Sequence, residues 1–91
     1  MYTVKVTGRF KKGVELCRKR GYDTALLRTA ITILSETGSL PESYKPHRLK
    51  GEYLGHWEAH LQPDWLLIWK KQKKTLILIL TATGTHTDLF G

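Results

Sequence analysis

The chain has 91 residues, 41% hydrophobic and 25% charged, a composition that fits one small globular domain and excludes a disordered segment. Fifteen Lys and Arg against eight Asp and Glu give a net charge of +7, which predicts attraction to polyanions, nucleic acid first. The single cysteine, Cys17, excludes an internal disulfide and fits a reducing compartment. No apolar run approaches the roughly 20 residues of a membrane helix and no signal-peptide core is present, so we expect a cytoplasmic protein.

The first part of the chain predicts one strand followed by two helices. Residues Tyr2–Thr7 alternate and are rich in β-branched side chains, which is typical of a short strand. An amphipathic helix with a basic outer face follows and ends at Gly21. A second helix, capped by Asp23 or Thr24, ends at Gly38. The apolar faces of the two helices consist of Phe10, Gly13, Val14 and Cys17, and of Leu27, Ala30, Ile31 and Leu34.

The second part predicts an irregular connection and then three strands. Two prolines make Ser39–Lys50 irregular, and the runs WLLIW and LILIL indicate central strands buried on both faces. The expected strands are Glu52–Leu61, Trp65–Lys70 and Thr75–Thr81, joined by a turn at Pro63 and a basic turn at Lys71–Lys74. The predicted architecture is therefore a single α+β domain, residues 1–91, with the order β-α-α-β-β-β. Its sheet is mainly antiparallel, with the helices packed on one face.

All four histidines lie in the second half of the chain, at His47, His56, His60 and His86. Several histidines on a basic scaffold suggest acid–base chemistry on a phosphate ester, although any single histidine is often only a surface residue. Metal binding is the alternative, because His56, His60 and Asp64 are spaced four apart. A proline before Asp64 argues against a helix there. On a strand the two histidines would stand about 13 Å apart, too far for one metal ion, so we expect none.

Three further residues have two open interpretations each. Asp64 follows the proline of a turn beside His60, where it either supports the turn or orients an imidazole. Phe90 either anchors the C-terminus in apolar surroundings or stacks on a base of single-stranded RNA. Trp65 is either a core residue or a platform for a base. These residues alone predict a basic domain that binds nucleic acid and that has the groups needed to cut it.

The segments YKPHRLKGEYLGHWEAHLQPDWLLIWK (Tyr44–Lys70) and TGTHTDLFG (Thr83–Gly91) resemble the YafQ-type branch of the RelE/ParE toxin superfamily. That branch has the motifs YK-x-H-x-L-x-G, A-H-x-x-PDW-x-L-I-(Y/W)-K and TGTH-x-x-LFG, and all three occur here in order. The resemblance implies a RelE-like fold and a type II toxin that cuts mRNA on ribosomes without a metal or other cofactor. The 2′-hydroxyl of the RNA would attack the neighbouring phosphate.

The resemblance also implies roles for residues that match the motifs. His47, His60, Asp64 and His86 match catalytic positions, and Trp65 and Phe90 match positions that hold bases or support the site. We expect His60 and His86 to transfer protons, with Asp64 orienting a neighbouring histidine and His47 contacting the phosphate or sharing proton transfer. Neither His56 nor Trp57 belongs to the motifs, and both are expected to be ordinary strand residues.

The basic surface predicts further contacts. Ribosomal RNA would meet the positive helix face and the basic turn, and Lys45, Arg48 and Lys50 would contact the substrate. The resemblance implies a cognate acidic antitoxin that covers the same charges. A competing hypothesis is a domain of the same fold that binds RNA or a protein without cutting.

Overall fold

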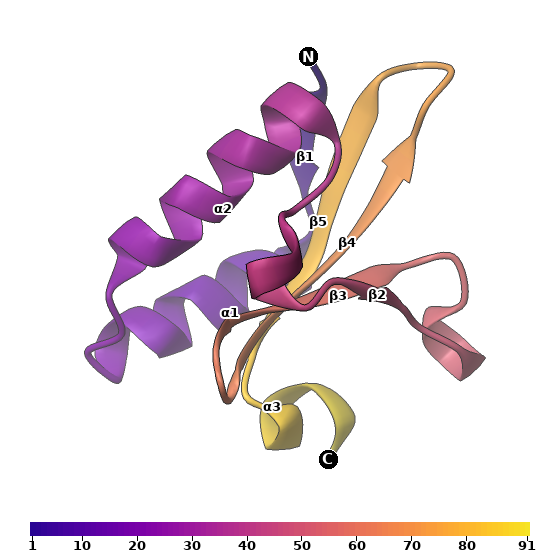
Figure 1. Ribbon diagram of the computed structural model, residues 1–91. Coiled ribbons are helices and arrows are strands. Elements are labelled where there is room, and N and C mark those ends of the chain that lie inside the picture. The colour runs from indigo at the N-terminus through magenta and orange to yellow at the C-terminus, as the bar shows by residue number, and fades with distance from the viewer.

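The structure, a computed structural model, describes residues 1–91. Two helices, α1 and α2, pack against one face of a five-stranded sheet, and a short third helix, α3, forms the C-terminus (Figure 1). The elements are β1 (Thr3–Val6), α1 (Gly8–Lys19), α2 (Thr24–Thr37), β2 (His47–Arg48), β3 (Trp57–Gln62), β4 (Trp65–Gln72), β5 (Ile77–Gly84) and α3 (His86–Phe90), with 3₁₀ turns at Glu42–Tyr44 and Gly51–Tyr53. The predicted α+β fold class is confirmed.

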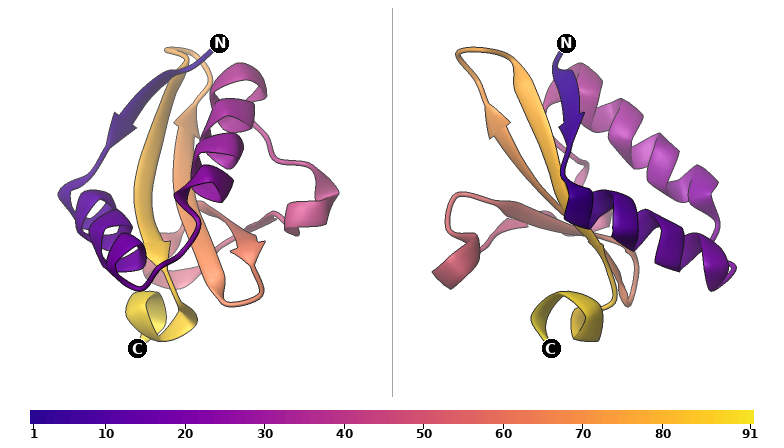
Figure 2. Two further views of the ribbon diagram at one scale, coloured as in Figure 1. Left: turned by 90° about the vertical axis from the view of Figure 1, so that its left-hand side faces the viewer. Right: turned by 180° about the vertical axis from the view of Figure 1, so that it is seen from behind.

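The strands are ordered β1-β5-β4-β3-β2 across the sheet. Only β1 runs parallel to its neighbour, β5, and the other three pairs are antiparallel. The long β1–α1–α2 excursion returns the chain to the far edge of the sheet, so that β3, β4 and β5 then form a continuous meander. Figure 2 shows both long helices on one face, while α3 lies at one end of the sheet. None of the helices is long and apolar enough to cross a bilayer.

Polar caps set the ends of the two long helices. The Thr7 hydroxyl accepts a hydrogen bond from the Phe10 amide at 3.0 Å, so α1 begins directly after Thr7, earlier than its apolar pattern suggests. Asp23 caps α2 by accepting from the Ala25 amide at 3.0 Å. Gly38 ends α2 in the left-handed conformation (φ 79°), where the absence of a side chain avoids a steric cost.

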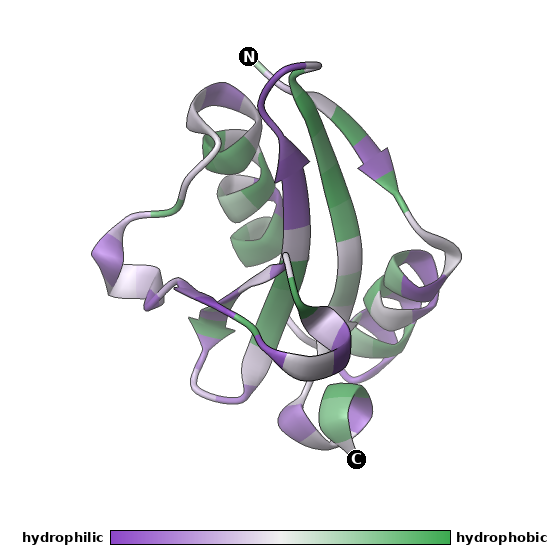
Figure 3. Ribbon diagram, turned by 90° about the vertical axis from the view of Figure 1, so that its right-hand side faces the viewer, coloured by the Kyte–Doolittle hydropathy of each residue, from purple (hydrophilic) through white to green (hydrophobic).

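Strand β4 is buried on both faces, as its continuous apolar run predicts. Successive side chains point to opposite faces of a sheet, so Trp65, Leu67 and Trp69 join the cluster under α1 and α2, while Leu66 and Ile68 face the other way. A second, smaller core forms there, completed by Tyr53, Ala82 and Leu89. The far end of β4 is hydrophilic where the hairpin with β5 extends beyond the helices (Figure 3). The second core anchors the elements that carry the polar site.

The expected strand Glu52–Leu61 is wrong in its first half. Gly51 and Gly55 have positive φ angles of 66° and 88°, and the chain makes a 3₁₀ turn between them before β3 begins at Trp57. Part of the connection expected to be irregular pairs instead with β3 as β2. A short strand therefore lies inside the segment expected to be irregular, and the first residues of the expected strand are irregular instead.

The basic turn also lies further along the chain than Lys71–Lys74. Strands β4 and β5 stay paired up to Gln72 and Ile77, so the turn spans residues 73–76, with Leu76 at a positive φ of 52°. At its other end β5 continues to Gly84, beyond the predicted end at Thr81. Because β4 and β5 pair along their whole lengths, each of them continues beyond the C-terminal end that its own residues predict. The last residues then form α3, which the sequence pattern did not predict.

Candidate active site

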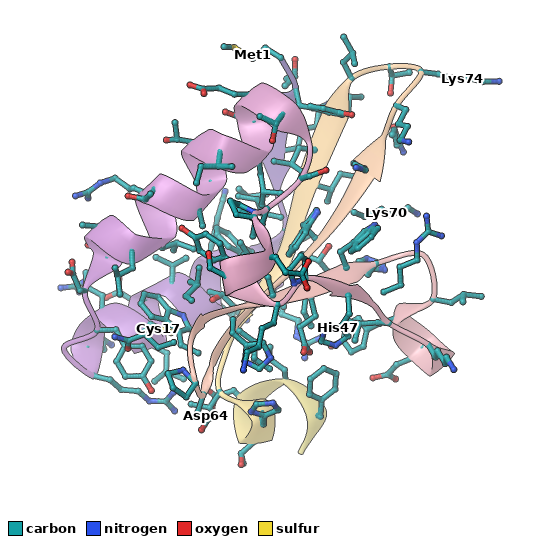
Figure 4. All side chains as sticks on the ribbon, in the orientation of Figure 1. Met1, Cys17, His47, Asp64, Lys70 and Lys74 are labelled. Atoms are coloured by element: carbon teal, nitrogen blue, oxygen red, sulfur yellow. The ribbon has the colours of Figure 1, made fainter.

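Three histidines form a row on the face of the sheet away from α1 and α2. The register places His47 opposite Glu58, and His60 lies two residues along β3 on that same face. The ring centroids of His47 and His60 are 6.4 Å apart, and those of His60 and His86 are 5.9 Å apart. In Figure 4, His47 and Asp64 both lie toward the end of the molecule that carries α3. The structure therefore brings together three elements that are distant in the sequence.

Asp64 binds His86 at one end of the row. Its Oδ1 accepts hydrogen bonds from the backbone amide of His86 at 2.9 Å and from the ring Nδ1 at 2.5 Å. These bonds hold the pKa of the Asp64 carboxyl below its usual range, the backbone amide having the larger effect. An ionised carboxylate on Nδ1 selects the tautomer that leaves the Nε2 lone pair free. His86 is thus arranged to accept a proton at Nε2.

His47 lies at the other end of the row, between two acceptors. Its Nε2 is 3.2 Å from the Glu58 carboxylate, and its Nδ1 is 3.2 Å from the backbone carbonyl of Lys45. Only the imidazolium form has a donor on both ring nitrogens, so it satisfies both contacts. Glu58 itself is 4% exposed, and a buried carboxylate needs a cationic or hydrogen-bonding partner. His47 therefore has an acceptor beside each of its ring nitrogens.

His60, in the middle of the row, borders an open cavity. Its Nδ1 is 3.3 Å from the Pro63 carbonyl, which can hold a proton on that nitrogen and leaves Nε2 without a protein partner. A cavity of about 360 Å³ lies beside it, with Lys45 on its wall; the lining residues are Ser43, Lys45, His60, Leu61, Gln62 and Pro63. This cavity places a lysine ammonium and an imidazole around one space large enough for part of a nucleotide.

The C-terminal helix α3 carries His86 and Phe90 and has its own cap. The Thr85 hydroxyl accepts from the Asp88 amide at 3.1 Å, and the Asp88 carboxylate accepts from the Thr85 amide at 2.9 Å. This reciprocal capping box begins the helix directly at His86. A side chain at Gly84 would approach Asp88 at 2.8 Å, so glycine is required for the strand to pass so close to the helix.

Arg9 of α1 and Arg20, the residue that ends it, tie α3 to the body of the domain. Both Arg20 Nη atoms donate to the Asp88 carboxylate, at 2.6 and 3.0 Å. Arg9 donates to the Leu89 carbonyl at 3.1 Å and also to the Tyr53 hydroxyl. The Arg20 guanidinium is the main reason that the pKa of Asp88 lies well below its usual range. The C-terminus is therefore held in place by long-range contacts.

The two aromatic candidates have different surroundings. Phe90 is 47% exposed and packs its ring edge-on against Tyr53, with centroids 5.6 Å apart, so one side remains available to a base. Trp65 is 1% exposed, donates from Nε1 to the Thr83 hydroxyl at 2.9 Å and packs against Tyr22. Burial gives Trp65 a supporting role and leaves Phe90 as the exposed aromatic of the pair.

The remaining predicted residues lie at different distances from the row. Lys45 belongs to it, through its carbonyl and the cavity beside His60. Arg48 follows His47 on β2 and therefore points to the opposite face, where its guanidinium lies 5.2 Å from the Trp57 ring centroid. Lys50 is exposed at the start of the 3₁₀ turn before β3. His56 lies just before β3 and not on a strand as expected, and it packs against Tyr53 outside the row.

Four residues of the site were not among the sequence candidates. Glu58 had a usable signal, because it alternates with His60 on one predicted strand. Arg9, Arg20 and Tyr53 had none, since they contact α3 across long stretches of sequence. The Arg9–Leu89 and Arg20–Asp88 pairs are 80 and 68 residues apart, and Tyr53 meets the ring of Phe90. No group of three or more His, Cys, Asp or Glu side chains is arranged to hold a metal ion.

We expect Asp64 and Asp88 to remain ionised below the usual aspartate range, which is centred near about 3.9. A lowered folded-state pKa means that each carboxylate adds stability above the unfolded-state pKa and loses it as the pH falls through the folded-state pKa. An NMR titration of the side-chain carboxyl carbons measures both values directly. An Asp64 curve with an ordinary midpoint would contradict the bond to His86, and an Arg20→Gln variant should move the Asp88 midpoint upward.

Comparisons with known proteins all find similarity to one group of bacterial toxins over nearly the whole chain. The model of the family described as "Bacterial toxin of type II toxin-antitoxin system, YafQ" matches residues 2–91. The mRNA interferase toxin YafQ of Escherichia coli K12 is 40% identical over 89 residues, which are 97% of this chain and 95% of that protein. The crystal structure of YafQ from E. coli BL21(DE3) superposes with a TM-score of 0.91 at 37% identity, over 100% of both chains. A chain of the E. coli DinJ–YafQ toxin–antitoxin complex gives 0.88 at 38% identity, over 99% of this chain and 98% of that one.

Proposed function

The chain belongs to the YafQ family of bacterial toxins from type II toxin–antitoxin systems, and from this membership we propose that it is an endoribonuclease that cuts mRNA on the ribosome. The observation that carries the proposal is the row of His47, His60 and His86, with Asp64 bound to the last of them. Its relatives named mRNA interferase give the substrate class. The messages and ribosomes it requires are in the cytoplasm, which is where we expect it to act.

His86 is the general base of the proposed reaction. Its Nε2 takes the proton of the ribose 2′-hydroxyl, whose oxygen attacks the adjacent phosphorus. Asp64 holds the Nδ1 proton and stabilises the imidazolium that forms, as an aspartate does for the histidine of a serine protease. The nucleophile belongs to the RNA, so the protein has to supply only proton transfer and charge.

His60 is the general acid, and His47 stabilises the phosphorane. Protonated His60 donates from Nε2 to the leaving 5′-oxygen, while a protonated His47, held between its two acceptors, opposes the charge that develops on the phosphate oxygens. One product ends in a 2′,3′-cyclic phosphate and the other begins with a 5′-hydroxyl. The 5.9 Å between the ring centroids of His60 and His86 leaves room for one phosphate to approach both.

Several neighbouring groups position the message. Phe90 stacks on a base through its exposed side, Trp65 supports the strand end beneath the site, and Lys45 and Lys50 contact phosphates. The positive outer face of α1 rests on ribosomal RNA, and the same charge attracts a cognate acidic antitoxin. DinJ is the antitoxin in the E. coli complex, and we propose an antitoxin of that kind for this chain.

The arginine that holds α3 should matter for cleavage. We expect Arg20→Gln to lower the cleavage rate between about 10- and 100-fold, because a small displacement of α3 misplaces both His86 and Phe90. Arg18→Gln is the matched control: it removes the same charge from the same helix, where Arg18 pairs only with exposed Glu15. Single-turnover cleavage and amide hydrogen exchange of residues 86–91 are the two measurements. Equal losses of cleavage rate in both variants would show that the rate depends on the overall positive charge and not on the contact between Arg20 and α3.

The test of the function is to map RNA 5′ ends after brief induction of the wild-type chain in cells. We expect new 5′-hydroxyl ends in translated messages, in one codon frame, and none with His86→Ala. Absence of new ends with unaffected growth would favour a binding domain without activity. Growth arrest without cleavage would overturn the choice of RNA as the target.

A further inference from the structure

A cleft lies on the side of the sheet opposite to the histidine row. Arg48, Trp57 and Trp69 are cross-strand neighbours on β2, β3 and β4, and alternation places them on the face that also carries α1 and α2. Two cavities border Trp57 and Lys71. One of about 300 Å³ reaches the β2–β3 loop at Leu54 and Gly55, and one of about 270 Å³ reaches the segment after α2, with Glu42 on its wall. The β2–β3 loop and the β4–β5 hairpin diverge from one another in Figure 1. The reaction proposed above does not use this cleft, although the sequence predicted that Arg48 contacts the substrate and that the basic turn contacts ribosomal RNA.

The larger cavity concentrates positive charge without a counter-ion. Arg48, Lys71 and Lys73 are on its wall and no carboxylate is; the other lining residues are Leu49, Leu54, Gly55 and Trp57. None of the three cations forms an ion pair with an acidic side chain. Burial, and then the charges of Lys73 and Arg48, lower the pKa of the Lys71 ammonium. Crowded cations without an acidic partner are an electrostatic cost that an anionic ligand relieves.

The same cleft offers an aromatic surface and a free donor. Trp57 is half-buried and stacks on Trp69, with ring planes 14° apart and centroids separated by 6.4 Å. The Arg48 guanidinium and the Lys71 ammonium lie 5.2 and 5.9 Å from the Trp57 ring centroid. Trp69 borders the smaller cavity, and its buried indole N–H has no acceptor. A nucleobase matches these features, because it has a flat ring and carbonyl acceptors beside a charged phosphate.

We propose that the Trp57 cleft binds a nucleotide of an RNA segment other than the one being cut. The base stacks on Trp57, and the phosphate lies among Arg48, Lys71 and Lys73. Arg48 is exposed, so its side chain can move to cover the outer face of the base. This inference rests on the proposed function for the identity of the polyanion as RNA. It gives the domain an anchoring site for RNA in addition to the cutting site and the outer face of α1.

The test is an NMR titration of the full ¹⁵N-labelled chain with a 2′-O-methyl RNA octamer, which lacks the nucleophile and cannot be cut. We expect saturable shifts of the Trp57 indole N–H and of the Arg48 and Lys71 amides. Trp57→Leu should weaken octamer binding about tenfold, as loss of one base–aromatic stack does. The buried indole of Trp65 serves as the internal reference for a general change in the domain.

A charge-matched pair of variants separates the cleft from overall charge. Arg48→Gln/Lys71→Gln/Lys73→Gln should abolish the Trp57 shift and make binding less dependent on salt. The control Lys5→Gln/Arg28→Gln/Lys70→Gln removes as many charges from exposed positions outside α1 and the cleft, and should leave the Trp57 shift intact.

Shifts confined to the histidine row, or equal losses in both triple variants, would overturn the proposal. So would a Trp57 shift produced by an acidic peptide and not by the octamer, which would assign the cleft to a protein. Failure of the proposed cleavage would instead appear as missing 5′-hydroxyl ends in cells while octamer binding at the cleft persists.

Discussion

Replacing His86 by alanine lowers the single-turnover rate of message cleavage by about 10²- to 10⁴-fold, the range that general acid–base catalysis contributes. The loss appears in the chemical step and not in binding, because the His86 side chain contacts only Asp64 among the polar groups of the domain. The fold should survive, since the ring is exposed and α3 keeps its capping box and its arginine contacts. His60→Ala gives a loss of similar size.

The two variants differ when the leaving group is changed. A message with sulfur in place of the 5′-bridging oxygen at the cut site needs no general acid, because a thiolate leaves without a proton. This substrate should restore much of the rate lost in His60→Ala and little of that lost in His86→Ala. The reverse pattern would exchange base and acid. Wild-type rates in both variants on the ordinary substrate would remove the histidines from the mechanism.

His47→Gln tests in the same assay whether His47 shares the general-acid role of His60 or supplies a charge. Glutamine keeps a polar side chain opposite Glu58 but cannot be positively charged. A loss that sulfur substitution does not restore agrees with stabilisation of the phosphorane. The sulfur substrate therefore separates His60, whose loss it restores, from His86 and His47, whose losses it does not restore.

The architecture follows from the sequence because strong local signals agree with one another. The runs in β4 and β5 are too apolar for a surface strand, and Pro63 marks the turn that precedes β4. The two helices have regular apolar faces, with Asp23 and Gly38 at the ends of the second. Such a pattern leaves few ways to pack β-α-α-β-β-β, and the predicted α+β class is the one observed.

Element ends were predicted less well, because neighbours decide them. β4 continues past Lys70 since β5 offers pairing partners as far as Gln72. β3 starts only at Trp57 because Gly51 and Gly55 adopt positive φ angles that a strand does not use. A helix in residues 86–90 has no apolar periodicity to reveal it. Its capping box, Thr85 with Asp88, was the one local signal available.

The residues of the site that belong to local motifs could be predicted from the sequence, and the contacts that depend on long-range packing could not. Motif resemblance singled out His47, His60, Asp64 and His86, and the structure brings all four to one end of the sheet. Sequence spacing could not show that Trp65 is buried or that Arg48 faces away from the row, because both depend on the sheet register. The arginine contacts to α3 join residues that only the completed fold brings together.

Asp64→Asn is the second substitution with a large expected effect, about 10²-fold on the chemical step. Asparagine can still accept one hydrogen bond from His86, but it has no negative charge to stabilise the imidazolium formed when the 2′-hydroxyl loses its proton. The message should not bind less tightly, because Asp64 is an acid and contributes no attraction to phosphate. A reduced rate constant at saturation with an unchanged KM is therefore the expected result.

The pH dependence of the wild-type protein adds a second check on Asp64. Because its pKa lies below the usual range, the carboxylate is ionised throughout the interval in which histidines titrate, near about pH 6.5. A limb of the pH–rate profile above pH 5 therefore reports histidine and not Asp64. Glu36→Gln, which removes one exposed carboxylate from α2, is the charge-matched control and should leave the rate unchanged. If Asp64→Asn matched this control, the 2.5 Å contact with His86 would be structural, and the Nε2 of His86 would act as a base without help from the carboxylate.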